Sequence, residues 1–112
     1  MSLPQTVPPS GEMTSFEGPL AGVRVLDLTS VVSGPFATQI LAQLGADVIK
    51  VESPQGDDLR RVGPMRNAGM GSIFLHANGG KGSVVLDLKT AEGREDLLAM
   101  VAEADVFVSQ LR

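Results

Sequence analysis

The chain has 112 residues, of which 43% are hydrophobic and 20% charged, an ordinary balance for one small globular domain and not for a disordered chain. Its formal net charge of -4 argues against nucleic acid as the main partner. Cysteine is absent, which excludes disulfides, thiolate metal ligands and cysteine nucleophiles, and no apolar run approaches the roughly 20 residues of a membrane helix. We therefore expect a cytoplasmic protein that uses no metal and binds neither nucleic acid nor membrane.

Residues 1–19 contain four prolines and lack the basic and apolar regions of a secretory signal. They leave little to bury, so we expect a disordered leader there and a folded domain over residues 20–112.

Residues 23–28 predict a buried strand, because they are nearly continuous in apolar character. A helix is expected next, with Pro35 at its first position and Gly45 just past its end. Five apolar residues would form its buried face: Phe36, Ala37, Ile40, Leu41 and Leu44. Residues 47–52 predict a second buried strand. This succession indicates a right-handed βαβ crossover with a parallel strand pair.

Residues 53–82 are rich in glycine, proline and asparagine and predict a long loop that is either functional or packed on another part of the protein. A strand is expected at residues 83–88 and another at residues 105–109. Between them Thr90 can cap a helix that has Glu92 in its first turn. Its buried face would consist of Leu97, Leu98, Val101 and Ala102.

The succession of elements predicts an α/β fold of Rossmann-like βαβ units with a mainly parallel sheet. Because the chain stops just after a bare strand, we interpret it as the front part of a larger domain.

The turn between the first strand and the first helix has one glycine, where a dinucleotide fingerprint needs G-x-G-x-x-G. An NAD site is therefore disfavoured. Residues 78–83 do not form a phosphate-binding P-loop either, since Gly82 follows Lys81 and position 75 is leucine. Helix N-terminal N–H groups and Ser33 could still meet an anion or a carbonyl oxygen, or the turn could simply cap the helix.

Between Leu59 and Leu86 every charged residue is positive, in a chain that is acidic overall; these residues are Arg60, Arg61, Arg66 and Lys81. Such a segment favours an anionic ligand, and the alternative is a solvated loop with incidental basic residues. His76, Asp27 and Asp87 lack the partners that would mark a catalytic acid or base, so we assign no catalytic residue.

Taken together, the segments resemble the N-terminal part of the class III (CaiB/BaiF-type) CoA-transferases. The resemblance extends over residues 20–112 and is carried by residues 20–29, 33–35, 44–52 and 86–89, by the Asn78-x-x-Lys81-x-Ser83 pattern, by Glu92-Gly93 and by residues 104–108. It implies an enzyme that moves coenzyme A from an acyl-CoA donor to a carboxylic acid acceptor, with an aspartate nucleophile beyond Arg112. The resemblance also implies an interlocked homodimer.

The resemblance further implies where coenzyme A binds. Val31, Val32 and Ser33 would lie along the pantetheine, and Lys81 would approach the nucleotide end. Residues Gln110, Leu111 and Arg112 would also line the site.

Two alternatives stay open. An α-methylacyl-CoA racemase shares the same N-terminal segments, although the presence of residues 72–78 favours a transferase. The chain could also be a complete, non-catalytic α/β nucleotide-binding module.

Overall fold

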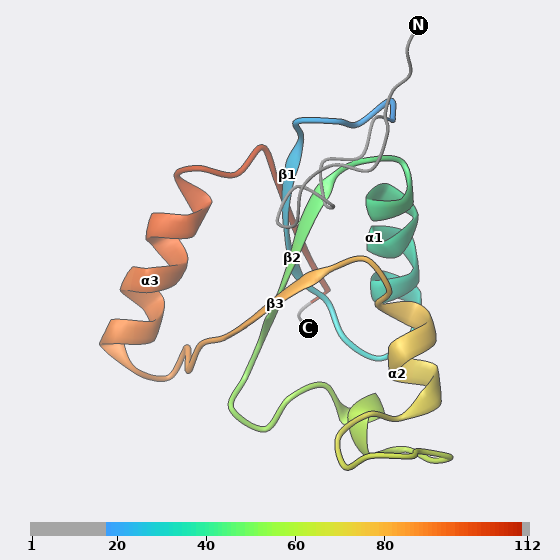
Figure 1. Ribbon diagram of the computed structural model, residues 1–112. Coiled ribbons are helices and arrows are strands. Elements are labelled where there is room, and N and C mark those ends of the chain that lie inside the picture. The colour runs from blue at the N-terminus through green and yellow to red at the C-terminus, as the bar shows by residue number, and fades with distance from the viewer. Residues whose placement is uncertain (1–17, 111–112) are drawn as a thin grey trace, which may run out of the picture.

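Figure 1 shows the computed structural model, in which residues 18–110 are described. Four strands form one sheet in the order β3-β2-β1-β4, and every neighbouring pair is parallel. The strands are β1 (Arg24–Leu28), β2 (Asp47–Glu52), β3 (Gly82–Val85) and β4 (Val106–Ser109). Most of the expected leader, residues 1–17, lies outside the described residues.

The helices lie on both faces of the sheet (Figure 1). On one face are α1 (Ser33–Gln43), α2 (Ser72–Ala77) and the short 3-10 helix η1 (Asp58–Arg61), and on the other is α3 (Ala91–Val101). The α/β class and the parallel sheet are therefore as the sequence predicts.

Helix α1 begins two residues before Pro35, and it ends where Gly45 adopts a φ of 107°. Its predicted buried face is wrong. Phe36 is 54% exposed and Ile40 41%, whereas the polar residues Thr38 and Gln39 are buried. The polar pair is buried because both side chains find hydrogen-bond partners beneath the helix, on Asp27 and on the N–H of Gly79 respectively.

The core lies between the sheet and α1, where Val25 and Val48 pack against Ala42 and Ala46. The opposite face is thinly covered: in α3 only Gly93 is buried, and Leu98, which we expected inside, is 67% exposed. Ala102 is also exposed, while Leu97 and Val101 are half-buried. Thr90 does cap α3 as predicted, by accepting a hydrogen bond from the N–H of Gly93 at 3.0 Å.

The segment predicted as a loop, residues 53–82, contains η1 and α2. Phe74 and Ala77 of α2 are buried, and α2 packs against η1 and α1. The strand expected at residues 83–88 ends at Val85.

Candidate functional site

The candidate site is the β1–α1 turn, residues 29–32, at the carboxyl edge of the sheet. In the sheet, β2 lies on one side of β1 and β4 lies on the other, so the strand order reverses at β1. Ligands of open α/β sheets bind where the strand order reverses in this way, outside the carboxyl ends of the strands. The two strand ends are joined directly, because the N–H of Ser30 donates to Oε1 of Gln110 at 3.2 Å.

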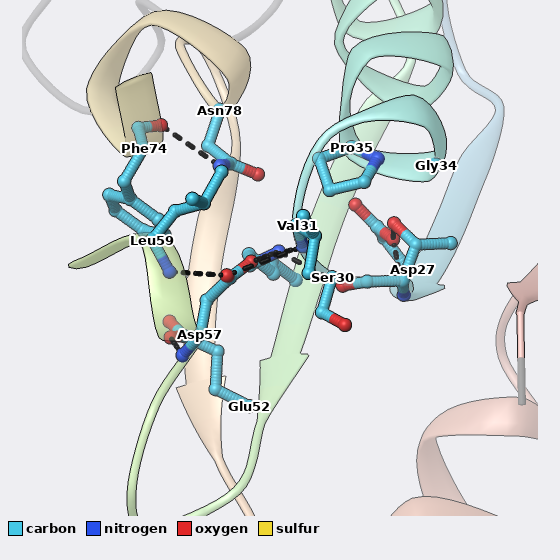
Figure 2. A network of polar contacts seen from close by, with 12 residues as sticks. Asp27, Ser30, Val31, Gly34, Pro35, Glu52, Asp57, Leu59, Phe74 and Asn78 are labelled. Carbon is cyan, nitrogen blue, oxygen red and sulfur yellow. Dashed lines mark hydrogen bonds and ion pairs between the residues drawn. The ribbon is translucent and has the colours of Figure 1, made fainter. Parts of the chain in front are cut away.

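Val31 has an unusual backbone conformation in this turn, with a φ of 72°. A β-branched residue rarely adopts a left-handed conformation, which costs about 1–3 kcal/mol. The N–H of Val31 donates to both carboxylate oxygens of Asp57, at 3.3 and 3.2 Å (Figure 2). A hydrogen bond to a charged acceptor contributes about 1.5–3 kcal/mol, so this contact is large enough to offset the strain.

The surface of the turn is apolar and open. The side chain of Val31 is 43% exposed and that of Val32 49%, and Ser33 is also exposed. Three of the residues that the resemblance places along the pantetheine therefore lie together, accessible to a ligand and next to Gln110.

A buried ion pair lies beneath the turn. Nζ of Lys50 is 3.0 Å from Oδ2 of Asp57, and the two side chains are 2% and 1% exposed. Lys50 also donates to the carbonyl oxygen of Thr29 at 3.0 Å. Asp57 caps η1 as well, by accepting from the N–H of Leu59 at 3.0 Å (Figure 2).

Lys81 points into the interior beneath the first turn of α1. Its ammonium donates to Oδ2 of Asp27 at 2.9 Å, to the carbonyl oxygen of Pro35 at 2.9 Å and to Oδ1 of Asn78 at 2.7 Å. An ammonium has three N–H donors, so all of them are used. In this conformation Lys81 links α1 to β1 through its hydrogen bonds to Pro35 and Asp27. The contact of Lys81 with a coenzyme A nucleotide stays a prediction.

Asp27, the partner of Lys81, is fully buried. Burial alone would raise its pKa, but hydrogen bonds from Lys81, Thr29 and Thr38 outweigh burial and lower the pKa of this carboxyl. Asp27 therefore stays ionised and serves as an acceptor that joins three segments.

Glu52 and Arg60 form a third pair, close to the first two. Oε2 of Glu52 accepts from Nη2 of Arg60 at 2.7 Å and from Oγ of Ser83 at 2.9 Å. Burial raises the pKa of Glu52, but the hydrogen bonds from Arg60, the Asp57 N–H and Ser83 lower it to about 2. The Arg60 guanidinium also lies 3.9 Å from the centre of the Phe74 ring, which fixes α2 against this pair.

That residues 59–86 favour an anionic ligand stays a prediction, but three of the four basic side chains of this segment have carboxylate partners. Arg60 pairs with Glu52, Arg61 with Asp58 and Lys81 with Asp27. The carboxylates come from residues before the segment, so the one-sided charge of the sequence stretch does not carry over to the folded surface.

A cavity of about 530 Å³ adjoins the turn at the carboxyl edge. It lies between the ends of β1 and β2, residues 53–58 and residues 86–89. Among residues 18–110 there is no group of three or more His, Cys, Asp or Glu side chains that could hold a metal ion. In the same part of the chain no helix is long and apolar enough to cross a bilayer.

The structure thus brings Val31, Val32, Ser33 and Gln110 together, while Leu111 and Arg112 lie outside the described residues. Sequence reasoning missed Lys50 and Asp57. Lys50 did leave a signal, because a lysine in the middle of an otherwise apolar buried strand needs a partner inside the fold.

The profile described as CoA-transferase family III matches residues 20–112. A succinyl-CoA:mesaconate CoA-transferase of Haloarcula hispanica is 46% identical over 99 residues, covering 85% of this chain and 25% of the relative. A succinate–glutarate CoA-transferase of Agrobacterium fabrum is 43% identical over 108 residues, covering 90% of this chain and 27% of the relative.

Among solved structures, a CaiB/BaiF family protein from Brucella suis superposes with a TM-score of 0.79 at 45% sequence identity. This match covers 84% of the chain and 26% of that structure. The chain therefore spans about a quarter of the length of the relatives it matches. The profile match over residues 20–112 and the fold agree, and the chain belongs to CoA-transferase family III.

Proposed function

We propose that residues 20–112 are the front part of a Rossmann-like, CoA-binding domain of an acyl-CoA:carboxylate CoA-transferase. The observation that carries the proposal is the exposed apolar turn of Val31 and Val32 at the point where the strand order reverses. The transferase names of the curated relatives support this activity over that of a racemase.

In this proposal each part of the turn has a separate task. Val31 and Val32 form an apolar wall along the pantetheine chain, which has few charges to satisfy. Ser33 and the free N–H groups of the first turn of α1 face the polar atoms of the thioester region. Gln110 fixes the turn against the end of β4.

The chemistry itself belongs to a residue that the described structure does not contain. An aspartate carboxylate beyond Arg112 attacks the donor thioester, so that an acyl anhydride forms and the CoA thiolate leaves. The thiolate then attacks the aspartyl carbonyl of this anhydride, which releases the donor acid and leaves an aspartyl-CoA thioester. The acceptor carboxylate attacks that thioester to form a second anhydride and frees the thiolate, and thiolate attack on the acceptor's acyl carbonyl gives the new acyl-CoA and restores the aspartate. An interlocked homodimer forms the complete enzyme. The turn contributes binding and orientation to these steps.

A titration followed by NMR tests the binding proposal directly. Coenzyme A added to the ¹⁵N-labelled chain should shift the amide signals of residues 30–34 and Gln110, and NAD at the same concentration should not. Equal shifts with NAD would replace the proposal with a general nucleotide-binding module. An absence of shifts at millimolar coenzyme A would overturn the assignment of the turn.

A chimera tests the transferase assignment. Residues 20–112 replace the equivalent segment of the Agrobacterium fabrum relative, whose name states transfer between succinate and glutarate. We expect CoA transfer at a rate within about tenfold of the parent enzyme, a difference of about 1.4 kcal/mol in barrier. A chimera that folds with the parent's oligomeric state but lacks activity would contradict the proposal.

A further inference from the structure

We infer that Lys50 and Asp57 are positioning residues that clamp the ligand turn in its strained conformation. The inference rests on the proposed function, because the turn is taken as the CoA-binding element. It assigns a task to two side chains that are almost fully buried beneath the turn.

The clamp acts on two neighbouring points of the backbone. Lys50 donates to the carbonyl oxygen of Thr29, and Asp57 accepts from the N–H of Val31. Ser30 lies between these two residues, and its own N–H donates to Oε1 of Gln110. Lys50 and Asp57 also form an ion pair with each other, with Nζ 3.0 Å from Oδ2. The hydrogen bond to Thr29 and the hydrogen bond from Val31 are therefore coupled through this pair.

The clamp explains an arrangement that the sequence alone would disfavour. Two consecutive valines would ordinarily turn at least one side chain toward the core, because apolar burial is favourable. Here both side chains remain about half exposed, and the left-handed backbone at Val31 is part of that arrangement. A buried carboxylate with its own cation keeps the Val31 N–H directed inward, so that both valines face outward.

The other buried pairs do not share this task. Asp27–Lys81 and Glu52–Arg60 join strands and helices, and their hydrogen bonds do not involve the backbone of Val31. They help to stabilise the same fold without acting on the turn's strained residue. A loss of general stability can therefore be separated from a loss of the clamp.

The test uses the chain itself in four forms: wild type, Asp57→Asn, Val31→Gly and the double variant. Asparagine keeps the shape of the side chain and removes its charge. Glycine adopts a positive φ without strain, so Val31→Gly removes the need for the clamp. Asp58→Asn is the matched control, because Asp58 is the exposed neighbour that pairs with Arg61 instead.

The first readout is hydrogen exchange of the residue 31 amide, with its ¹³Cα and ¹³Cβ shifts. Asp57→Asn should speed exchange of the Val31 amide about tenfold or more, which corresponds to about 1.4 kcal/mol of lost protection. Asp58→Asn should leave that exchange unchanged. Unchanged exchange in Asp57→Asn would overturn the inference.

The second readout is the affinity for coenzyme A. Asp57→Asn should weaken binding about tenfold in the valine background and much less in the Val31→Gly background. Equal losses in both backgrounds would show that Asp57 acts independently of the Val31 conformation, and would overturn the clamp. Should the wild-type chain not bind coenzyme A, the proposed function fails, while the exchange measurement still decides the inference.

Discussion

Lys81 donates to three acceptors from three segments: the carboxylate of Asp27, the carbonyl of Pro35 and the side chain of Asn78. The two residues of the sequence pattern Asn78-x-x-Lys81 are thus joined by a local hydrogen bond between their side chains. The same ammonium neutralises Asp27, whose carboxylate is fully buried.

Replacement of Lys81 by methionine leaves Asp27 as an uncompensated buried charge. We expect the free energy of unfolding to fall by about 3–5 kcal/mol, as is usual when one partner of a buried pair is removed. Urea unfolding of the variant measures this loss, with the exposed residue Lys89 replaced by methionine as the control. An unchanged unfolding midpoint would show that the ammonium is free to meet a ligand instead.

Glu52 predicts a pH dependence of stability in a defined range. The pKa of Glu52 in the folded chain is about 2, below the 4.5 that is usual for a glutamate. A carboxyl with a lowered folded pKa contributes stability above its unfolded pKa and loses it as the pH falls, here between about 4.5 and 2. At about 1.4 kcal/mol for each pH unit by which the pKa is lowered, the full contribution is between about 3 and 4 kcal/mol.

The variant Glu52→Gln isolates this contribution, because its side chain does not titrate. The slope of unfolding free energy against pH between about 4.5 and 2 should be shallower in the variant than in the wild type. Parallel slopes would mean that the Arg60 pair does not lower the pKa of Glu52.

At the scale of elements, α1 is the most informative. Its position and its end could be predicted, because Gly45 and the spacing of the apolar residues mark a helix of this length. Its buried face could not, since periodicity identifies an apolar stripe but does not tell which face has a partner in this part of the chain. The polar residues Thr38 and Gln39 are buried because their side chains form hydrogen bonds there. Thr38 donates to the carboxylate of Asp27, and Gln39 accepts from the N–H of Gly79.

The four strands could be predicted for a different reason: each is a short apolar run bounded by turn residues. Helices η1 and α2 could not, because a helix of only four or six residues carries too little periodicity among the glycines around it. At the candidate site, the resemblance indicates the turn residues, whose contact with coenzyme A stays a prediction, but Asp57 could not be predicted. Its importance depends on the Val31 backbone, which only the fold reveals.

The first turn of α1 packs closely on the ends of two strands, and Gly34 makes this possible. A Cβ at position 34 would overlap the side chain of Thr29 and Oε1 of Gln110. We expect Gly34→Ala to destabilise the chain by about 1–3 kcal/mol, as overpacking does, and to shift the Gln110 side-chain amide signals. Thermal unfolding and NMR measure the two effects.

Gly82→Ala is the matched control for this variant, because a Cβ there would make only ordinary contacts, the nearest at 3.8 Å. If both alanine variants unfold at the wild-type temperature, the close approach of α1 to the strand ends is not required.

At the scale of the whole molecule, large apolar side chains remain exposed on both sides of the sheet. Phe36 is 54% exposed on α1, Phe107 46% on β4 and Leu98 67% on α3. Patches of this kind mark surfaces that associate with other protein.

We therefore expect the 112-residue chain to self-associate, and the double variant Phe36→Gln, Leu98→Gln to weaken association about tenfold, or about 1.4 kcal/mol. Sedimentation velocity over a range of concentrations measures this change. Because both side chains are exposed, the substitutions should change the unfolding free energy by no more than about 0.5 kcal/mol. A wild-type chain that stays monomeric and melts in one sharp, reversible transition would contradict the expectation.

The contact between Ser30 and Gln110 joins residues 80 positions apart in the sequence. A loop of that length closes late, because its entropy must be lost before the contact can form. Strand β1 can pair with β2 as soon as residues 24–52 have emerged from the ribosome, yet the β1–α1 turn stays open on its β4 side until Gln110 has been synthesised. The β1–β2 pair therefore forms early, and the turn is fixed only together with the last strand of the sheet.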